Sequence, residues 1–180
     1  MNQCKTACGG IIHISQQAQH HLKAHPDVVE HLHTAICKVR LPNVPKEIAE
    51  VIDVGQIIGR RSIVETAPLR IEERALFSIR ANRALPSRVS KAVEYGENTS
   101  KIVVIARPSL IENQYELVTA WIGILAMKEP GDKSIADPSE FQECLRFWSA
   151  NAIVYDASCM GPVFESSWQD VLRLGKCPFI

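Results

Sequence analysis

Basic side chains gather on strand-like segments in the middle of this sequence of 180 residues. Between Arg74 and Arg107 there are seven Lys and Arg but only two acids, Glu94 and Glu97, although the whole chain is formally neutral. A planar guanidinium donates several fixed hydrogen bonds to phosphate oxygens, so arginines displayed on a sheet can receive a phosphate. This local charge bias favours chemistry on a nucleic acid.

The residue types suit RNA cleavage without a metal. In that reaction the 2′-hydroxyl attacks the adjacent phosphorus, and the extra negative charge of the transition state must be stabilised. Arg80 and Arg88, on adjacent expected strands, are the candidates for this role, and Thr119 can donate a hydroxyl hydrogen bond. Glu65 is a candidate general base, a role worth roughly 10²–10⁴-fold in rate. The alternative for each arginine is a solvated or salt-bridged surface residue.

Other bases are expected to hold the substrate backbone. Arg83, at the turn after Arg80, can join the phosphate site, while three further bases would steer the RNA inward; these are Lys91, Lys101 and Arg107.

Histidine and cysteine patterns give weaker indications of a metal. His21 and His25 lie one helical turn apart, and Cys4, Cys8 and Cys37 with a histidine are a conceivable zinc set. Scattered thiols and an exposed helix face are the favoured interpretations of these patterns. No dinucleotide or phosphate-loop glycine motif occurs either, so we expect neither a metal nor a cofactor.

The elements that must position these residues fall into two groups. The first third of the chain is expected to be helical, over 16–25, 27–39 and 46–58, with Ser15 and Asp27 capping the first two helices. After Gly59 the apolar period changes to two, which predicts a meander of strands. The strand segments read RSIVET, ALFSIRAN, SRVSKAV, KIVVIAR and YELVTAWIG.

These elements predict an α+β fold in a single domain, 1–180. The helical part spans 1–58, the antiparallel sheet with a loop and a short helix spans 59–155, and a surface tail spans 156–180. The helices should cover one face of the sheet and leave the other as a wet platform for the arginines.

The order of the segments from Gly59 to Tyr155 resembles a known family. GRRSIVETAP, FSIRANRALPSRVSKAV, KIVVIARP, ELVTAWIG, KEPGD and FWSANAIVYD follow one another as in bacterial and phage-type ribonucleases of the barnase/EndoU/colicin/RelE-like superfamily. The resemblance implies N-terminal helices packed on a four-stranded, or slightly larger, antiparallel sheet. It also implies cleavage of RNA, often tRNA, without a metal.

The resemblance adds two residues to the candidate site and identifies two departures. Ser87 falls, like Glu65 and Arg80, on a position that the family keeps polar. In the acidic loop, Gly131 follows Glu129-Pro130 where the family has a tryptophan. Asn151 stands where the family has a histidine, and an asparagine can orient a phosphate but cannot take a proton. Either Glu65 or a helix histidine therefore serves as the base, or the activity has been lost.

Two functions remain open at this point. The first is a metal-independent endoribonuclease of toxin or phage-associated type, with RNA as substrate and an acidic immunity or antitoxin protein as partner. The second is a catalytically inactive module that binds RNA or protein as an inhibitor or effector.

Composition sets the remaining expectations. The longest apolar runs are far shorter than the roughly 20 residues that span a bilayer, so we expect no membrane association. The sequence begins without a secretory pattern, which predicts a cytoplasmic protein with reduced cysteines.

Overall fold

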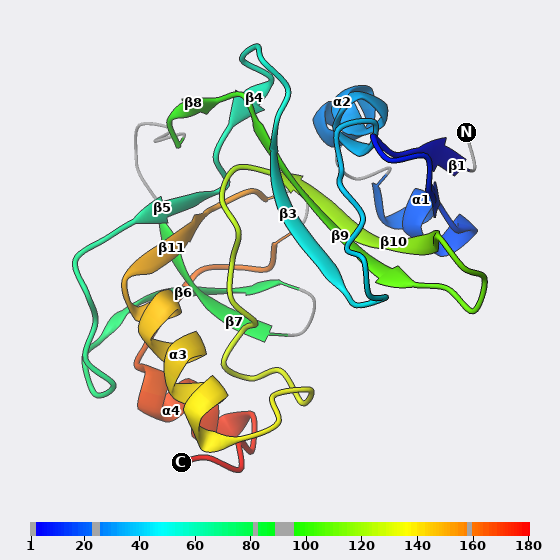
Figure 1. The fold of residues 1–180 in the computed structure, drawn as a ribbon. Helices are drawn as coiled ribbons and strands as arrows, with labels where there is room; N and C mark the ends of the chain where they lie inside the picture. The colour runs from blue at the N-terminus through cyan, green and yellow to red at the C-terminus, as the bar shows by residue number, and fades with distance from the viewer. Residues whose placement is uncertain (1–2, 23–25, 81–82, 89–95, 158–159) are drawn as a thin grey trace. The chain divides into compact units, whose positions relative to one another are not determined.

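The computed structural model describes residues 3–22, 26–80, 83–88, 96–157 and 160–180 (Figure 1). Contacts between Cα atoms divide the chain into two compact units. The first unit comprises 1–61 and 97–125, and the second comprises 62–96 and 126–180. The expectation of a single domain stays a prediction.

The first unit contains a five-stranded sheet of order β1-β2-β10-β9-β3. Its strands are β1 (Gln3–Lys5), β2 (Ile11–His13), β3 (Ile48–Asp53), β9 (Lys101–Pro108) and β10 (Gln114–Ile122). All neighbouring strands are antiparallel except β2 and β10, which are parallel.

Two helices cover one face of this first sheet. They are α1 (Gln16–Leu22) and α2 (Pro26–Ile36), which contact β9 and β10 (Figure 1). Their apolar residues form one core with alternate side chains of β9, namely Ile102, Val104 and Ala106. Burial of this apolar area is the main stabilising contribution to the unit.

Both predicted N-terminal helices are confirmed. The Ser15 hydroxyl accepts the Ala18 backbone N–H at 3.1 Å, as expected for the cap of α1. The apolar stripe of α2 is buried, since Val28 and Leu32 are at most 4% exposed. Asp27 lies in the first turn of α2 rather than at its cap, because that helix begins at Pro26.

The third predicted helix, over 46–58, is wrong. The chain there forms β3, which pairs antiparallel with β9 along its whole length. Its two most buried side chains, Ile48 and Ile52, are four residues apart, and this spacing fits one face of a helix and one face of a strand equally well. The part of the chain expected to be helical, 1–58, therefore supplies three strands to the first sheet.

A short ladder marks the place where the chain leaves and re-enters the first unit. β4 (Gly59–Arg60) pairs antiparallel with β8 (Asn98–Thr99). Next to it, Arg61 forms an ion pair with Glu97, and its backbone N–H donates to the Glu97 carbonyl oxygen. The intervening segment, 62–96, belongs to the second unit.

The second unit contains another five-stranded sheet, of order β12-β6-β7-β11-β5. Its strands are β5 (Ile63–Glu65), β6 (Ala75–Arg80), β7 (Arg83–Arg88), β11 (Asn151–Val154) and β12 (Phe164–Ser166). β7 and β11 are parallel and the other pairs are antiparallel. The helices of the unit are α3 (Pro138–Ser149) and α4 (Trp168–Leu174).

The second sheet is buried on both faces at its centre. Phe77 and Ser78 are adjacent in β6 and therefore point to opposite faces, and both are fully buried. Phe77 packs edge-to-face on Trp168 of α4, with ring centroids 5.2 Å apart. Among the described residues, the centre of this sheet therefore offers no wet platform.

The predicted surface tail, 156–180, is also wrong. This segment forms β12, which pairs with β6, and α4, whose Trp168 and Leu172 are at most 2% exposed. The two apolar positions lie one helical turn apart and complete the core of the second unit.

The predicted fold class is contradicted. In place of helices on one antiparallel meander, the described residues form two five-stranded sheets with parallel and antiparallel pairs and one two-stranded ladder, and four helices. Strands lie within the segments RSIVET, ALFSIRAN, KIVVIAR and YELVTAWIG, but these strands are divided between two sheets. The predicted strand SRVSKAV overlaps β7 only at Ser87 and Arg88, residues 89–93 lie outside the described residues, and the turn expected at Pro86 is wrong because Pro86 lies inside β7. Local periodicity identifies a strand without identifying its neighbours.

Candidate functional site

Five of the predicted site residues lie on one face of the second sheet. The register pairs Arg80 with Arg83, Ser87 with Ile153, and Asn151 with Glu65. Side chains alternate along each strand, so these positions share a face with Ser78 and Leu85, which also oppose each other. The sheet therefore groups part of the predicted site.

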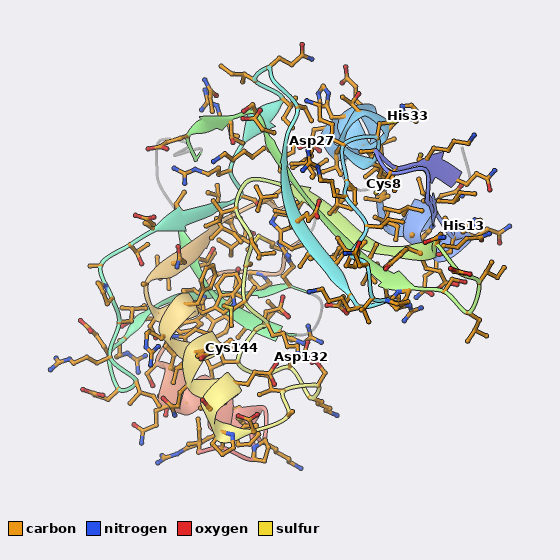
Figure 2. The ribbon with its side chains drawn as sticks, viewed as in Figure 1. Cys8, His13, Asp27, His33, Asp132 and Cys144 are labelled. Carbon is orange, nitrogen blue, oxygen red and sulfur yellow. The ribbon has the colours of Figure 1, made fainter. Side chains whose placement is uncertain are left out.

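Arg83 is not available to a phosphate in this arrangement. Its guanidinium forms ion pairs with Glu129 and with Asp132, the latter at 3.2 Å between Nη2 and Oδ2. Both acids are less than a fifth exposed and lie on the loop before α3, where Figure 2 labels Asp132. Two carboxylates already occupy the planar fork of the arginine.

Asp132 is kept charged beside this arginine. Burial raises the pKa of its carboxyl, but the Ser134 backbone N–H, at 2.8 Å, and the Ser134 hydroxyl lower it, as does the positive charge of Arg83. The net effect leaves the pKa of Asp132 below its usual value. The Arg83–Asp132 ion pair is therefore present at neutral pH.

Asn151 is a structural residue in this fold. It is 7% exposed, and its Nδ2 donates to the carbonyl oxygen of Phe147 in the last turn of α3 at 2.8 Å. This bond ties the end of α3 to the start of β11. The side chain is almost fully buried, so little of it is exposed to a substrate.

Two further predicted residues of the second unit, Glu65 and Arg80, have described side chains. Glu65 is exposed on β5, an edge strand, and Arg80 is half-buried. The backbone of Arg88 pairs with Val154, but the side chain of Arg88 and the whole of Lys91 lie outside the described residues.

Three predicted residues lie in the first unit instead. Lys101, Arg107 and Thr119 share the face of the first sheet that is opposite to the core formed with α1 and α2, because Thr119 pairs with Ile105 and side chains alternate along β9. Arg107 forms an ion pair with Glu116 at 3.2 Å. The predicted site is thus divided between two sheets that belong to different units.

The sequence interpretation missed the acids that neutralise the basic segment. Arg74 pairs with Glu165 at 2.9 Å, Arg83 with Glu129 and Asp132, and Arg107 with Glu116. The acidic loop that contains Glu129 was visible in the sequence, but its distance along the chain concealed the pairing. It also missed four buried polar atoms, for which the described residues provide no hydrogen-bond partner: Ser78 Oγ, Ser87 Oγ, Asn151 Oδ1 and Trp168 Nε1.

Cysteine and histidine side chains approach each other in the first unit without forming a metal site. Cys37 Sγ lies 3.9 Å from both ring nitrogens of His33, and Cys4 is buried whereas Cys8 is exposed. Within the described ranges, no three His, Cys, Asp or Glu side chains are placed to hold a metal ion. The His21–His25 pair lies outside the side chains that the structure describes.

Comparisons with known proteins do not assign the chain to a family. No protein-family model, curated protein or solved structure matches it. In the described part of the chain, the helices are all too short or too polar to cross a bilayer.

Proposed function

We propose that this chain is a non-catalytic module that binds another protein. The observation that carries the proposal is the neutralisation of the basic segment. Four arginines between residues 74 and 107 have described side chains, and three of them form ion pairs with acids. A surface that already holds its own counter-ions gains little from phosphate binding.

The residues expected to perform catalysis support the same proposal. Asn151 is used inside the fold, and Thr119 belongs to a different unit from Arg80. The cleavage mechanism predicted from the sequence needs these groups around one phosphodiester. Because the Asn151 amide is used inside the fold, cleavage by a set that includes Arg80, Thr119 and Asn151 is the less favoured of the two functions.

A protein partner is favoured over RNA by the surface of the first sheet. Val51 on β3 is 42% exposed, and Val118 on β10 is 43% exposed. Such apolar side chains release water on contact with another apolar surface. The net charge of zero provides no long-range attraction for a polyanion.

The first experiment compares RNA and protein as ligands of the purified chain. We expect no cleavage of total tRNA in the presence of a chelator, and RNA binding that is weak at physiological salt. A protein that uses several phosphate contacts would instead show an RNA affinity that falls steeply with salt. A plot of the logarithm of the association constant against the logarithm of the salt concentration would have a slope of about −0.7 per phosphate contact on single strands.

A matched variant distinguishes RNA cleavage by this chain from cleavage by a contaminating ribonuclease. Arg80→Ala should behave like the unmodified chain in the tRNA assay. Cleavage by the unmodified chain that disappears in Arg80→Ala would refute the proposal and restore the ribonuclease. A complex with a protein that survives RNase treatment and gel filtration would support it.

A further inference from the structure

One edge of the first sheet, β3, is longer than the other sheet edges, and no strand in the described part of the chain pairs with its outer side. Among the edge strands of the two five-stranded sheets, β1, β5 and β12 each have three residues, whereas β3 has six. Short edge strands are a common protection against unwanted pairing, and proline or lysine on the strand is another. β3 contains no proline or lysine, and its charged side chains are the two acids Glu50 and Asp53.

The backbone groups that point away from the sheet can be assigned. The Val54 N–H donates to the Ser100 carbonyl oxygen on the β9 side at 2.9 Å. Because inward and outward groups alternate in an antiparallel pair, the N–H and C=O groups of Ala49 and Val51 face the open edge. The Asp53 carbonyl oxygen fits this assignment, since it accepts the Lys38 Nζ at 2.8 Å.

The side chains of β3 define what would fit beside it. Ala49 and Val51 are exposed on the face that α1 and α2 leave uncovered. Glu50 points to the other face, where it is half-buried and accepts the Arg40 backbone N–H at 3.4 Å. A strand added at this edge would therefore meet an apolar side chain on one face and a carboxylate on the other.

We propose that β3 receives an extended segment of a partner protein as a sixth strand of the first sheet. Main-chain hydrogen bonds to Ala49 and Val51 would hold the segment, and an apolar residue would pack on Val51. A Lys or Arg of the segment would lie opposite Glu50, since opposite charges stabilise cross-strand pairs. This inference rests on the proposed protein-binding function and names the surface and the partner chemistry.

A second copy of this chain fits the edge less well. The outward N–H and C=O groups belong to the odd-numbered residues of β3. Two antiparallel copies of β3 can therefore pair over most of their length in only two registers, one centred on Val51 and one centred on Glu50. The first register sets Glu50 against Ile52, and the second sets Glu50 against Glu50. Neither gives the carboxylate a basic neighbour.

The test uses the full chain and a blocked nine-residue peptide of alternating Lys and Val. We expect saturable binding by fluorescence anisotropy, with hydrogen exchange of the Ala49 and Val51 amides slowed at least tenfold by the peptide. A peptide of alternating Glu and Val, which keeps the strand propensity and reverses the charge, should bind at least tenfold more weakly.

Variants at two positions test the geometry. Val51→Pro removes the outward N–H without removing a bond to β9, a place where edge strands accept proline. We expect it to weaken peptide binding at least tenfold, whereas Val51→Thr, which keeps the N–H, should bind normally. Glu50→Gln should reduce the preference for the Lys peptide over the Glu peptide, and it serves as the second test if Val51→Pro does not fold.

The outcomes separate this inference from the proposed function. Four results would each overturn the edge-strand proposal while leaving a protein-binding module in place. They are unchanged peptide binding by folded Val51→Pro, slowed hydrogen exchange only outside β3, no peptide binding at all, and a dimer of the chain that excludes the peptide. RNA cleavage that depends on Arg80 would overturn the proposed function itself.

Discussion

At the scale of single residues, Asn151 and Arg83 show how a position that looks catalytic can serve the fold. Asn151 connects α3 to β11 through the Phe147 carbonyl oxygen, and Arg83 holds the loop that contains Glu129 and Asp132. Both side chains are polar because they satisfy or neutralise another polar group within the second unit. The residue types alone do not distinguish this use from substrate binding.

Removing the amide of Asn151 should therefore affect stability. In Asn151→Ala the hydrogen bond to the Phe147 carbonyl oxygen is lost, and we expect the free energy of unfolding to fall by about 1–3 kcal/mol. Urea denaturation followed by circular dichroism measures the change. Asn43→Ala, at an exposed loop position, is the control and should stay within about 0.5 kcal/mol of the unmodified chain. Equal stability of the two variants would contradict a structural role for Asn151.

The pairing of Arg83 was beyond the reach of sequence reasoning for a physical reason. Glu129 and Asp132 lie in a loop whose position depends on the chain returning to the second unit after Leu125. A charge count over 74–107 records the bases, but the neutralising acids come from other segments. The predicted phosphate receptor rested on that incomplete count.

At the scale of elements, the sequence predicted what is local and missed what depends on partners. The apolar stripe of α2 was identified correctly because its spacing fits a helix, and β9 was identified correctly because its short apolar run is rich in β-branched residues. β3 was mistaken for a helix because the spacing of Ile48 and Ile52 fits both periods. β1 and β2 were missed because three residues are too few to display a period.

The helix α3 offers a prediction at this scale. Asp137 is its N-cap, and its side chain accepts the Glu140 backbone N–H at 2.9 Å. Asp137→Ala should lower the free energy of unfolding by about 1 kcal/mol, whereas Asp137→Asn, which keeps a capping oxygen, should be nearly neutral. Thermal unfolding of the two variants measures this difference. A destabilisation of equal size in both would point to charge rather than capping.

At the scale of the whole molecule, the chain passes between its two units three times. Each unit is assembled from two separate segments, and the predicted catalytic residues are divided between them because the strand sequence from β5 to β10 is divided. A meander of neighbouring strands was the simplest topology consistent with the turns. The parallel pairs β2/β10 and β7/β11 required knowledge of contacts far apart in the chain.

This division predicts how fragments behave. A fragment of residues 1–125 retains every residue of the first unit, including its complete hydrophobic core. We expect slow hydrogen exchange to persist in β3, β9 and β10 of this fragment, while β6 and β7, deprived of β11 and β12, exchange rapidly. The complementary fragment, 62–180, is the matched control and should protect β6 and β7. Loss of protection throughout both fragments would show that neither unit folds alone.

The β4–β8 ladder has a consequence for synthesis on the ribosome. The hairpin of β6 and β7 emerges before β9 and β10, yet its flanking strands β11 and β12 are translated last. Closure of the β4–β8 ladder, with the Arg61–Glu97 ion pair, would hold the nascent β6–β7 hairpin as a looped-out insertion. Meanwhile the N-terminal strands and helices would pack on β9 and β10. The order of translation would then keep the strands of the two sheets apart during folding. When the whole chain refolds from denaturant, all strands are present at once, and each must find its own sheet.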